Sequence, residues 1–440
     1  MKRLSLLLLS SVVILAGSCS TRPKVKAWND SDKELAHAIL SDRTLDVVDS
    51  MGHKLLLRGY NAGDGYIQTW IRDFNTFIET ILEVVEPADV KVALTTFFLM
   101  QQENGEILDG YVPREEFKWE DPDTYELPNA PNMVGFKNTV ETDQETSLIQ
   151  AVRKYVEKTG DMAFLEEEVA GKTVLRRLSD AVEYLMNEKL DPDLNLLTGA
   201  LTADWGDVED DPVNCVDIGP ESTVTIDVYD NAMMVIALRD LAYLDPAGKN
   251  KWDSMRQMFA DNIRHDLWDS KNHKFIPHLY PQGNKSAMDF DESRIYYHGG
   301  TAIAIEADIL SNEEIRKVNE DMLRNVKESG MPSIGLTVYP TYPPGFFPGW
   351  MASPFNYQNG GDWTWFGGRM IQQLVRNGFV AEAYQEIRPM IDRVIVNGDF
   401  YEWYAPGCVP SGSSSFKGSA GVLCKAIEML KEWAKEIENK

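Results

Sequence analysis

The spacing of its helical segments constrains the fold of this chain more than any other feature. Apolar residues recur every three or four positions in about a dozen segments bounded by polar residues, glycine or proline, which is the pattern of amphipathic helices. The segments cover residues 32–50, 72–85, 88–103, 143–158, 162–188, 225–244, 247–266, 298–310, 311–328, 361–377, 378–396 and 417–437. The sequence therefore predicts an all-α protein.

The links between these segments alternate in length. Short links join the two members of a pair, as at 86–87, 159–161, 245–246 and 377–378. Long stretches rich in Gly, Pro and Trp join one pair to the next, at 104–142, 189–224, 267–297 and 329–360. Loops of this length in compact domains are usually functional. A ring of helical hairpins, an (α/α)6 toroid with its long loops gathered at one end, accounts for the alternation and would span 31–440 as one domain.

The first residues predict export. A basic start at residues 1–3 precedes an apolar run over residues 4–15, and small residues lead from there to Cys19. The run is too short to span a membrane and has the pattern of a bacterial lipoprotein signal. We expect a signal peptide at 1–18, lipidation of Cys19, a tether at 19–30, and a periplasmic or cell-surface position on the outer membrane. An ordinary secretory signal with an incidental cysteine is the alternative.

Charge and composition exclude several functions. The formal net charge of −26 argues against nucleic acid as a partner and leaves the lipid anchor as the expected membrane contact. No metal or cofactor is expected, because the six histidines never fall at HxH or HExxH spacing and no phosphate loop or Gly-x-Ser-x-Gly elbow occurs. Besides Cys19, the spacing of Cys215, Cys408 and Cys424 is compatible with one disulfide or with three thiols.

Tryptophan is concentrated in the loop-rich segments. Seven of the eleven tryptophans lie in or beside them: Trp70, Trp119, Trp205, Trp350, Trp363, Trp365 and Trp403. Any one of them could simply pack a loop core. Together they favour a carbohydrate pocket, because sugar rings stack their C–H faces on indoles and offer hydroxyls to carboxylates and amides.

The first of four motifs runs from Gly63 to Phe74 and enters a helix. It places Trp70, Arg72 and Asp73 at the helix start, where an acidic residue is favoured by the helix dipole. We expect Asp73 to accept hydrogen bonds from two sugar hydroxyls, with Arg72 holding it in place. A capping ion pair is the alternative.

The second motif is an acidic run at residues 202–211. Five acids within eight positions cannot all ionise without mutual cost, so at least one is a candidate for a raised pKa and for a general acid. Asp204 is preferred to Asp207 because the adjacent Trp205 can desolvate it. A solvated acidic turn or a calcium site is the alternative.

The third motif covers residues 357–369. It combines Gln358, Asn359 and Asp362 with paired glycines and with Trp363 and Trp365 at a predicted helix entrance, which suits a polar ligand as well as a packed helix cap.

The fourth motif covers residues 398–404 and is followed by a serine-rich segment at 411–416. It places Glu402 between aromatic residues, including Trp403, where a carboxyl group is costly to bury unless it is hydrogen-bonded or has a task. We expect Glu402 to be a general base that activates water.

In this order, the motifs resemble those of the six-hairpin glycosidases that include neutral/alkaline invertases, trehalases and debranching or processing α-glucosidases. Residues 357–365 are similar to the invertases' Gln-Asn-Gly-Gly-x-Trp-x-Trp, 70–74 to their Arg-Asp-Phe, and 401–404 to their Pro-Glu-Tyr-Tyr. Residues 204–207 are similar to the Asp-Trp-Asn-Asp of disaccharide phosphorylases. The extended trehalase and phosphorylase signatures are absent.

The resemblance implies an inverting, exo-acting glycoside hydrolase, α-glucosidase-like, that cleaves oligosaccharides. The mid-chain aspartate would be the general acid, Glu402 the general base, and Asp73 a ligand of the terminal sugar. Two other interpretations fit the same residues. One is a surface glycan-binding lipoprotein without catalysis, which would not need the acidic run. The other is an epimerase or lyase on the same toroid.

Overall fold

The computed structural model describes residues 28–118, 124–125, 127–281 and 288–439. The expected signal peptide, the lipidation site Cys19, most of the tether and Trp119 lie outside these ranges. Trp28 already packs edge-on against Trp433, with ring centroids 5.9 Å apart, and Asn29 caps the first helix. The last residues of the expected tether, 28–30, therefore belong to the folded part.

The chain is mainly helical, as predicted. The α-helices are α1 Asp30–Ser41, α2 Arg43–Leu56, α3 Ile71–Ile81, α4 Pro87–Met100, α5 Gln144–Thr159, α6 Val174–Tyr184, α7 Val228–Leu244, α8 Lys249–Asn262, α9 His298–Glu306, α10 Asn312–Ser329, α11 Thr364–Arg376, α12 Val380–Glu386, α13 Arg388–Asn397 and α14 Lys417–Glu438. Single π-helical turns extend α6 and α8, at Leu185–Lys189 and Ile263–Leu267.

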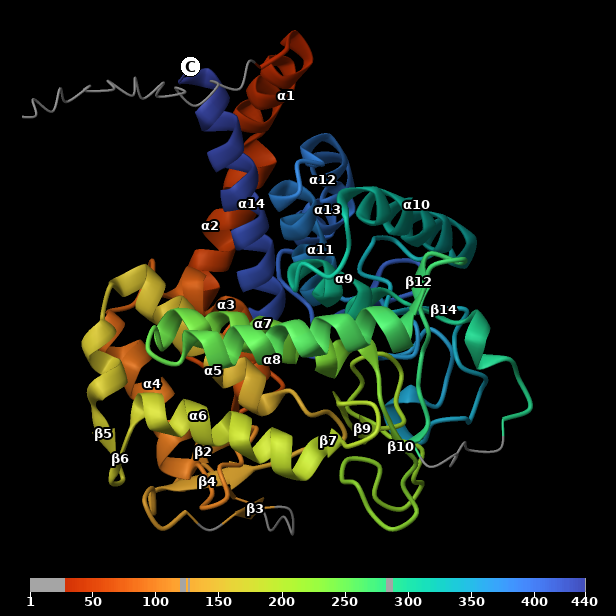
Figure 1. Ribbon diagram of the computed structural model, residues 1–440. Helices are drawn as coiled ribbons and strands as arrows, with labels where there is room; N and C mark the ends of the chain where they lie inside the picture. Colours follow the sequence, from red (N-terminus) through yellow and green to blue (C-terminus); the bar gives the residue numbers. More distant parts are fainter. Residues whose placement is uncertain (1–27, 119–123, 126, 282–287, 440) are drawn as a thin grey trace, which may run out of the picture.

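Six of these helices form a closed inner ring. The contacts run from α3 to α5, α7, α9, α11 and α14 in turn, and α14 packs against α3 to close the ring. The other helices lie outside it: α4 and α6 against α5, α8 against α7, α10 against α9, α12 against α11, and α2 against α14. Figure 1 shows α14 standing beside α1 and α2, so the two ends of the described chain lie together.

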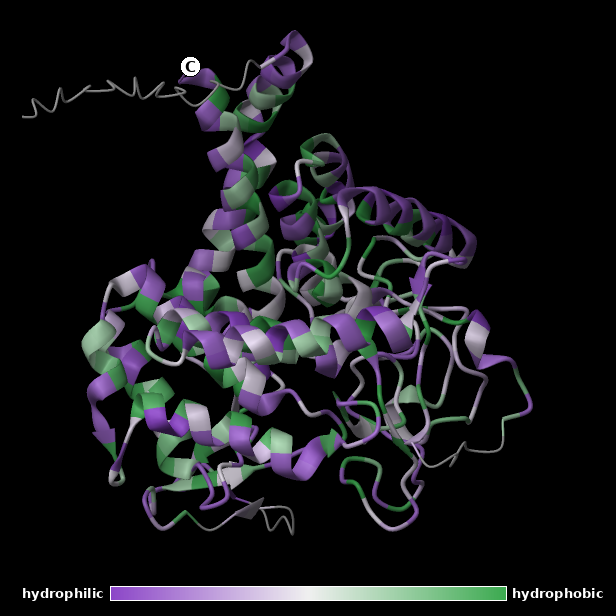
Figure 2. Cartoon of the chain, viewed as in Figure 1, coloured by the Kyte–Doolittle hydropathy of each residue, from purple (hydrophilic) through white to green (hydrophobic). Residues whose placement is uncertain are grey.

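Burial follows this arrangement. Inner helices such as α7 and α9 are buried almost throughout, as expected for helices that are covered on all sides. The outer helix α10 buries one apolar stripe and is otherwise hydrophilic, which Figure 2 shows as a mostly purple helix. No helix within the described ranges is long and apolar enough to cross a membrane.

The strands are short and lie in the connecting loops. The largest sheet is antiparallel, with the order β1-β2-β4-β3, from β1 Thr69–Trp70, β2 Gly110–Pro113, β3 Thr124–Tyr125 and β4 Met133–Phe136. The rest form two-stranded pairs: β5 Glu168–Val169 with β6 Lys172–Thr173, β7 Leu190–Asp191 with β8 Leu196–Leu197, β9 Gly199–Ala200 with β10 Val224–Thr225, β11 Trp268–Asp269 with β12 Lys274–Phe275, β13 Tyr296–Tyr297 with β14 Val338–Tyr339, and β15 Trp403–Ala405 with β16 Val409–Ser411.

Three predicted helices are interrupted. The segment 32–50 breaks at Asp42, whose side chain accepts a hydrogen bond from the Thr44 N–H and so starts a new helix. The segment 162–188 contains the β5–β6 hairpin, and 378–396 divides at Ile387, two residues before Pro389. Each break lies where a side-chain cap, a tight turn or a proline replaces the helical hydrogen bond.

Candidate active site

A cavity of about 730 Å³ lies at the end of the ring where the inner helices begin. Trp70, Trp363 and Phe416 immediately precede α3, α11 and α14 and line it. Helix N-termini favour negative charge, so this end of the toroid suits carboxylates. Three of the four predicted long loops, 104–142, 189–224 and 329–360, also contribute lining residues.

Most of the predicted site residues meet in this cavity although they are far apart in the sequence. Those that line it are Trp70, Arg72, Asp73, Trp205, Asp207, Trp363, Trp365, Glu402 and Trp403. Asp204, Gln358, Asn359 and Asp362 are not among the lining residues.

Asp207 is held by three donors from two parts of the chain. One carboxylate oxygen forms an ion pair with the guanidinium of Arg72. The other accepts hydrogen bonds from the Tyr357 hydroxyl at 3.0 Å and from Gln358 Nε2 at 2.9 Å. Gln358 therefore acts from behind the cavity wall by positioning Asp207.

Arg72 is shared between two carboxylates. Its Nε and Nη2 donate to Asp143 at 2.6 and 3.1 Å, and the Tyr229 hydroxyl donates to the same aspartate at 2.6 Å. The expectation that Arg72 holds Asp73 is thus replaced by a pairing with Asp143 and Asp207. A single positive charge balances two carboxylates here.

Glu402 is 4% exposed and has a partner on each oxygen. The Tyr66 hydroxyl donates to Oε1 at 2.8 Å, and the Ser413 N–H donates to Oε2 at 2.7 Å. Gly412 precedes that N–H with φ +67°, and a Cβ there would lie 2.4 Å from Glu402 Oε2, so the position requires glycine. Burial raises the pKa of Glu402 to about 7, and the charge of Asp207 adds to this, although Ser413 and Tyr66 lower it.

Two further carboxyl groups face the cavity. Burial and the nearby charges of Glu402 and Asp207 raise the pKa of Asp73 well above its usual value, although Arg72 lowers it. Burial also raises the pKa of Asp109 to about 7, against the lowering effect of Arg72. Burial thus favours the neutral form of both acids.

Asp204 lies outside the cavity and caps a helix. Its two carboxylate oxygens accept the N–H groups of Gly299 and Gly300, at 2.6 and 2.8 Å, at the start of α9. A Cβ on Gly299 would lie 2.8 Å from Asp204, so glycine permits this close approach. Burial raises the pKa of Asp204 to about 8, although both N–H groups lower it. With both oxygens engaged and no side-chain exposure, the position does not support the preference for Asp204 over Asp207 as the general acid.

Asn359 and Asp362 also have structural partners instead of facing the cavity. Asn359 Oδ1 accepts from the Tyr342 N–H at 2.8 Å, and its Nδ2 donates to the carbonyl of Met351 at 3.1 Å. Asp362 accepts from Ser333 and forms an ion pair with Arg393 at 2.8 Å. The expected contact of these two residues with a ligand is corrected to a role in holding the loops.

The predicted tryptophans form the cavity wall. Trp205 packs edge-on against Trp363, with centroids 4.7 Å apart, and tilts against Trp365 at 4.8 Å. Trp205, Trp363, Trp365 and Trp403 are at most 8% exposed. They shape the pocket, whereas Trp350, which was not among the predicted ligand contacts, is 61% exposed and lines the same cavity.

Several site residues had no recognisable signal of their own. Tyr66, Tyr357 and Ser413 lie inside or beside the predicted motifs, but nothing in the sequence shows that their polar groups turn to Glu402 or Asp207. Asp143 and Asp109 lie outside every motif. The pairing of β1 with β2 brings Asp109 to Arg72, and the packing of α5 on α3 brings Asp143 there.

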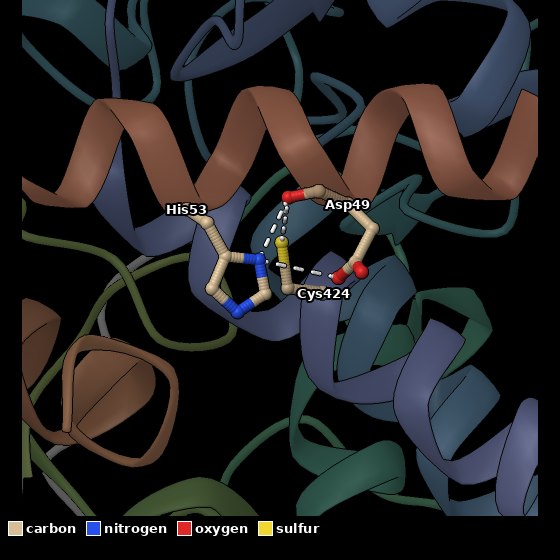
Figure 3. Close-up of side chains that lie close together, drawn as sticks. All are labelled: Asp49, His53 and Cys424. Carbon is tan, nitrogen blue, oxygen red and sulfur yellow. Dashed lines mark hydrogen bonds and ion pairs between the residues drawn. The ribbon is translucent and has the colours of Figure 1, made fainter. Parts of the chain in front are cut away.

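Two clusters of potential metal ligands occur within the described ranges. In the first, His53 Nδ1 donates to the carbonyl of Asp49 at 2.8 Å and Nε2 donates to Glu83 at 3.0 Å, beside the buried Cys424 (Figure 3). Since both ring nitrogens have oxygen partners, hydrogen bonding within the protein explains this cluster. The second cluster, Asp227, Asp230 and Glu141, lies buried near the start of α7. Cys215, Cys408 and Cys424 are all free thiols.

Comparison with known proteins gives matches at the level of structure. No protein-family model matches the chain, and no curated protein matches it in sequence. A GH63 mannosylglycerate hydrolase from Thermus thermophilus, solved with Tris and D-glycerate, aligns with a TM-score of 0.63 and 15% identity over 86% of this chain and 99% of that one. A rhamnosidase from Klebsiella oxytoca with rhamnose bound aligns with a TM-score of 0.54 and 15% identity over 89% of this chain and 64% of that one.

These neighbours confirm the predicted fold class. The chain has the helical toroid fold of the six-hairpin glycosidases, and the closed ring of inner helices agrees with it. At this level of identity the likeness concerns the fold, and the chemistry must be argued from the site.

Proposed function

We propose that this protein is an inverting, exo-acting glycoside hydrolase that uses Asp207 and Glu402 as its catalytic pair. The observation that carries the proposal is the meeting of these two carboxyl groups, from loops almost two hundred residues apart, in one aromatic-lined cavity of a six-hairpin toroid. The structural neighbours named as glycoside hydrolases support it.

Glu402 fits the role of general base. A base is most effective when its pKa lies near the working pH, because it is then both ionised and strongly basic. Burial brings the pKa of Glu402 to about 7. The Tyr66 hydroxyl and the Ser413 N–H fix its orientation, so that it can take a proton from a water molecule on one face of the sugar.

Asp207 is proposed as the general acid, in keeping with the family likeness of the mid-chain motif. After it protonates the leaving oxygen, its carboxylate is stabilised by Arg72, Tyr357 and Gln358, which all donate to it. The charge of Arg72 is already balanced by Asp143, so a proton on Asp207 leaves the guanidinium paired.

Asp73 is proposed to bind the terminal sugar. Within the described part of the chain, its carboxyl group forms no ion pair. The group lies in the cavity close to Gly418, where the rings of Trp365 and Phe416 also lie. Its raised pKa allows it to donate a hydrogen bond to one sugar hydroxyl as well as to accept another. By the family likeness, we propose an α-glucosidase-like preference.

The test is hydrolysis of a panel of α- and β-linked disaccharides, followed by NMR from the first minutes of reaction. We expect release of a monosaccharide whose first-formed anomer is inverted relative to the bond cleaved. The variants Glu402→Gln and Asp207→Asn should lose activity by about a hundredfold or more while still binding sugar. Sugar binding without any hydrolysis by the unaltered protein would instead identify a glycan-binding protein.

We also propose that the protein is exported and anchored by a lipid on Cys19. The support is the sequence of residues 1–19 alone. Expression of the full chain in a bacterial host should place it in the membrane fraction, and Cys19→Ala should release it. A protein that fractionates identically with and without this substitution would exclude the anchor.

A further inference from the structure

We infer that the outer part of the cavity binds an uncharged leaving group, with Trp350 as its stacking surface. This inference rests on the proposed hydrolase function and adds the class of substrate. It is carried by the charges of the lining residues and by the position of one exposed indole.

The cations of the cavity are already engaged. Within the described residues, Arg72 and Lys137 are the basic side chains that line it. Arg72 is held by Asp143 and Asp207. Lys137 is 3% exposed at its side chain, and its Nζ donates to the carbonyl of Ile107 and to Gln144 and Glu145, at 2.7, 3.1 and 3.4 Å. Neither cation is free to pair with a carboxylate on a ligand.

The acids of the cavity outnumber these cations. Asp73, Asp109, Asp207 and Glu402 all line it. A substrate carboxylate would lose its hydration in the cavity without gaining a cation of its own, and a buried charge without a partner is unfavourable. The cavity is therefore unsuited to uronic acids and to glycosides of glycerate. In this respect it contrasts with the structural neighbour solved with D-glycerate, which is an anion.

Trp350 is held in place although its ring is exposed. The Asn356 side chain donates to the carbonyl of Trp350 at 2.6 Å, and the next residue, Met351, is fully buried. The backbone is thus anchored directly after an indole that is 61% exposed. An aromatic ring kept rigid at the mouth of a cavity offers a flat apolar surface at low cost in conformational entropy.

Trp350 is linked to the general acid through one residue, Tyr357. Its ring centroid is 6.0 Å from that of Tyr357, and the Tyr357 hydroxyl donates to Asp207 at 3.0 Å. Glu402 is instead held by Tyr66 and Ser413. Because the acid protonates the leaving oxygen, the group that stacks on Trp350 is the sugar or alcohol that departs.

The first experiment compares two leaving groups. A glycosyl fluoride releases fluoride, which has no ring to stack on Trp350, whereas a disaccharide releases a sugar ring. For a glucosidase the probes are α-D-glucosyl fluoride and the glucobioses. We expect Trp350→Ala to lower kcat/KM for the disaccharide about tenfold more than for the fluoride. Trp350→Phe keeps an aromatic ring and should therefore retain most of the kcat/KM for the disaccharide. Val396→Ala, at an 81% exposed position on α13, is the matched control.

The second experiment compares two glycosides that differ in one group. Glucosylglycerol carries a hydroxymethyl group where glucosylglycerate carries a carboxylate. Mannosylglycerol and mannosylglycerate form a second such pair. We expect kcat/KM for the neutral member to exceed that of the acid by at least about tenfold, because the carboxylate finds no free cation in the cavity.

The outcomes separate this inference from the proposed function. Equal losses on fluoride and disaccharide in Trp350→Ala, or preference for the glycerate glycoside, would overturn the inference while leaving a hydrolase. If no disaccharide, fluoride or glycerol glycoside is hydrolysed, the proposed function itself fails.

Discussion

At the scale of single residues, Glu402 and Asp207 illustrate two ways of preparing a carboxyl group. Glu402 has two neutral donors and little solvent, so burial dominates and its pKa rises to about 7. Asp207 is one quarter exposed at its side chain and has a guanidinium, a phenol and an amide around it. Different surroundings thus suit similar groups to different tasks.

The pKa of Glu402 predicts the acidic limb of the pH profile. A general base works when it is ionised, so kcat/KM should rise with pH along its acidic limb up to about 7. Since the Tyr66 hydroxyl lowers this pKa, Tyr66→Phe should move the limb to higher pH. Tyr401→Phe, a neighbouring tyrosine outside the cavity lining, is the control. A limb that stays in place in Tyr66→Phe would contradict the assignment of Glu402.

At the scale of elements, the two aspartates of the acidic motif separate activity from stability. Asp204 caps α9 through two N–H groups, and an amide offers a single acceptor atom in place of two. We expect Asp204→Asn to destabilise the fold by about 1–3 kcal/mol in urea unfolding. Asp207→Asn should abolish hydrolysis with little change in stability. An Asp204→Asn protein that is fully stable but inactive would return the general acid to Asp204.

His53 joins α2 to the residues that follow α3 and predicts a pH-dependent contribution to stability. Burial lowers the pKa of His53, but Glu83 and Asp49 outweigh this effect, and the pKa is raised overall. The stabilisation is therefore complete below the unfolded pKa of about 6.5 and is lost as pH rises through the folded value. The difference in Tm between the unaltered protein and His53→Gln should shrink between pH 5.5 and 8.5. A difference that is constant over this range would exclude the ion pair.

The helices could be predicted because their pattern is local. Periodic apolar residues mark α3, α5 and α7 within a few positions, and the long loops between pairs are equally visible in the sequence. The break at Asp42 could not be predicted with the same ease, because an aspartate in a helical pattern resembles a surface residue until its side chain is seen to cap α2. Short strands such as β1 and β2 depend on pairing across the chain and leave no periodic signal.

The segments that form the site could be predicted from the sequence, but the contacts between their side chains could not. The motifs around Asp73, Asp207 and Glu402 identify the segments that meet in the cavity. Which aspartate of the acidic motif faces inward depends on the turn at Asp204, whose φ of +62° directs it to α9. Such long-range contacts are decided by tertiary packing, which one sequence does not display.

At the scale of the whole molecule, the toroid explains why one end carries the chemistry. The inner helices α3, α11 and α14 begin at the same cavity, so residues from 65 to 416 converge there and the helix dipoles favour its carboxylates. Outer helices such as α8 and α10 only cover the ring. Substitutions on these outer helices should affect stability and leave the cavity unchanged.

The central claim is that Asp207 and Glu402 together hydrolyse a glycosidic bond. The most direct measurement is the rate of monosaccharide release from the disaccharide panel by the unaltered protein, Asp207→Asn, Glu402→Gln and Asp204→Asn under one set of conditions. The account predicts hydrolysis by the unaltered protein and by folded Asp204→Asn, with losses of about a hundredfold or more in the other two variants. Undiminished hydrolysis by both Asp207→Asn and Glu402→Gln would contradict it.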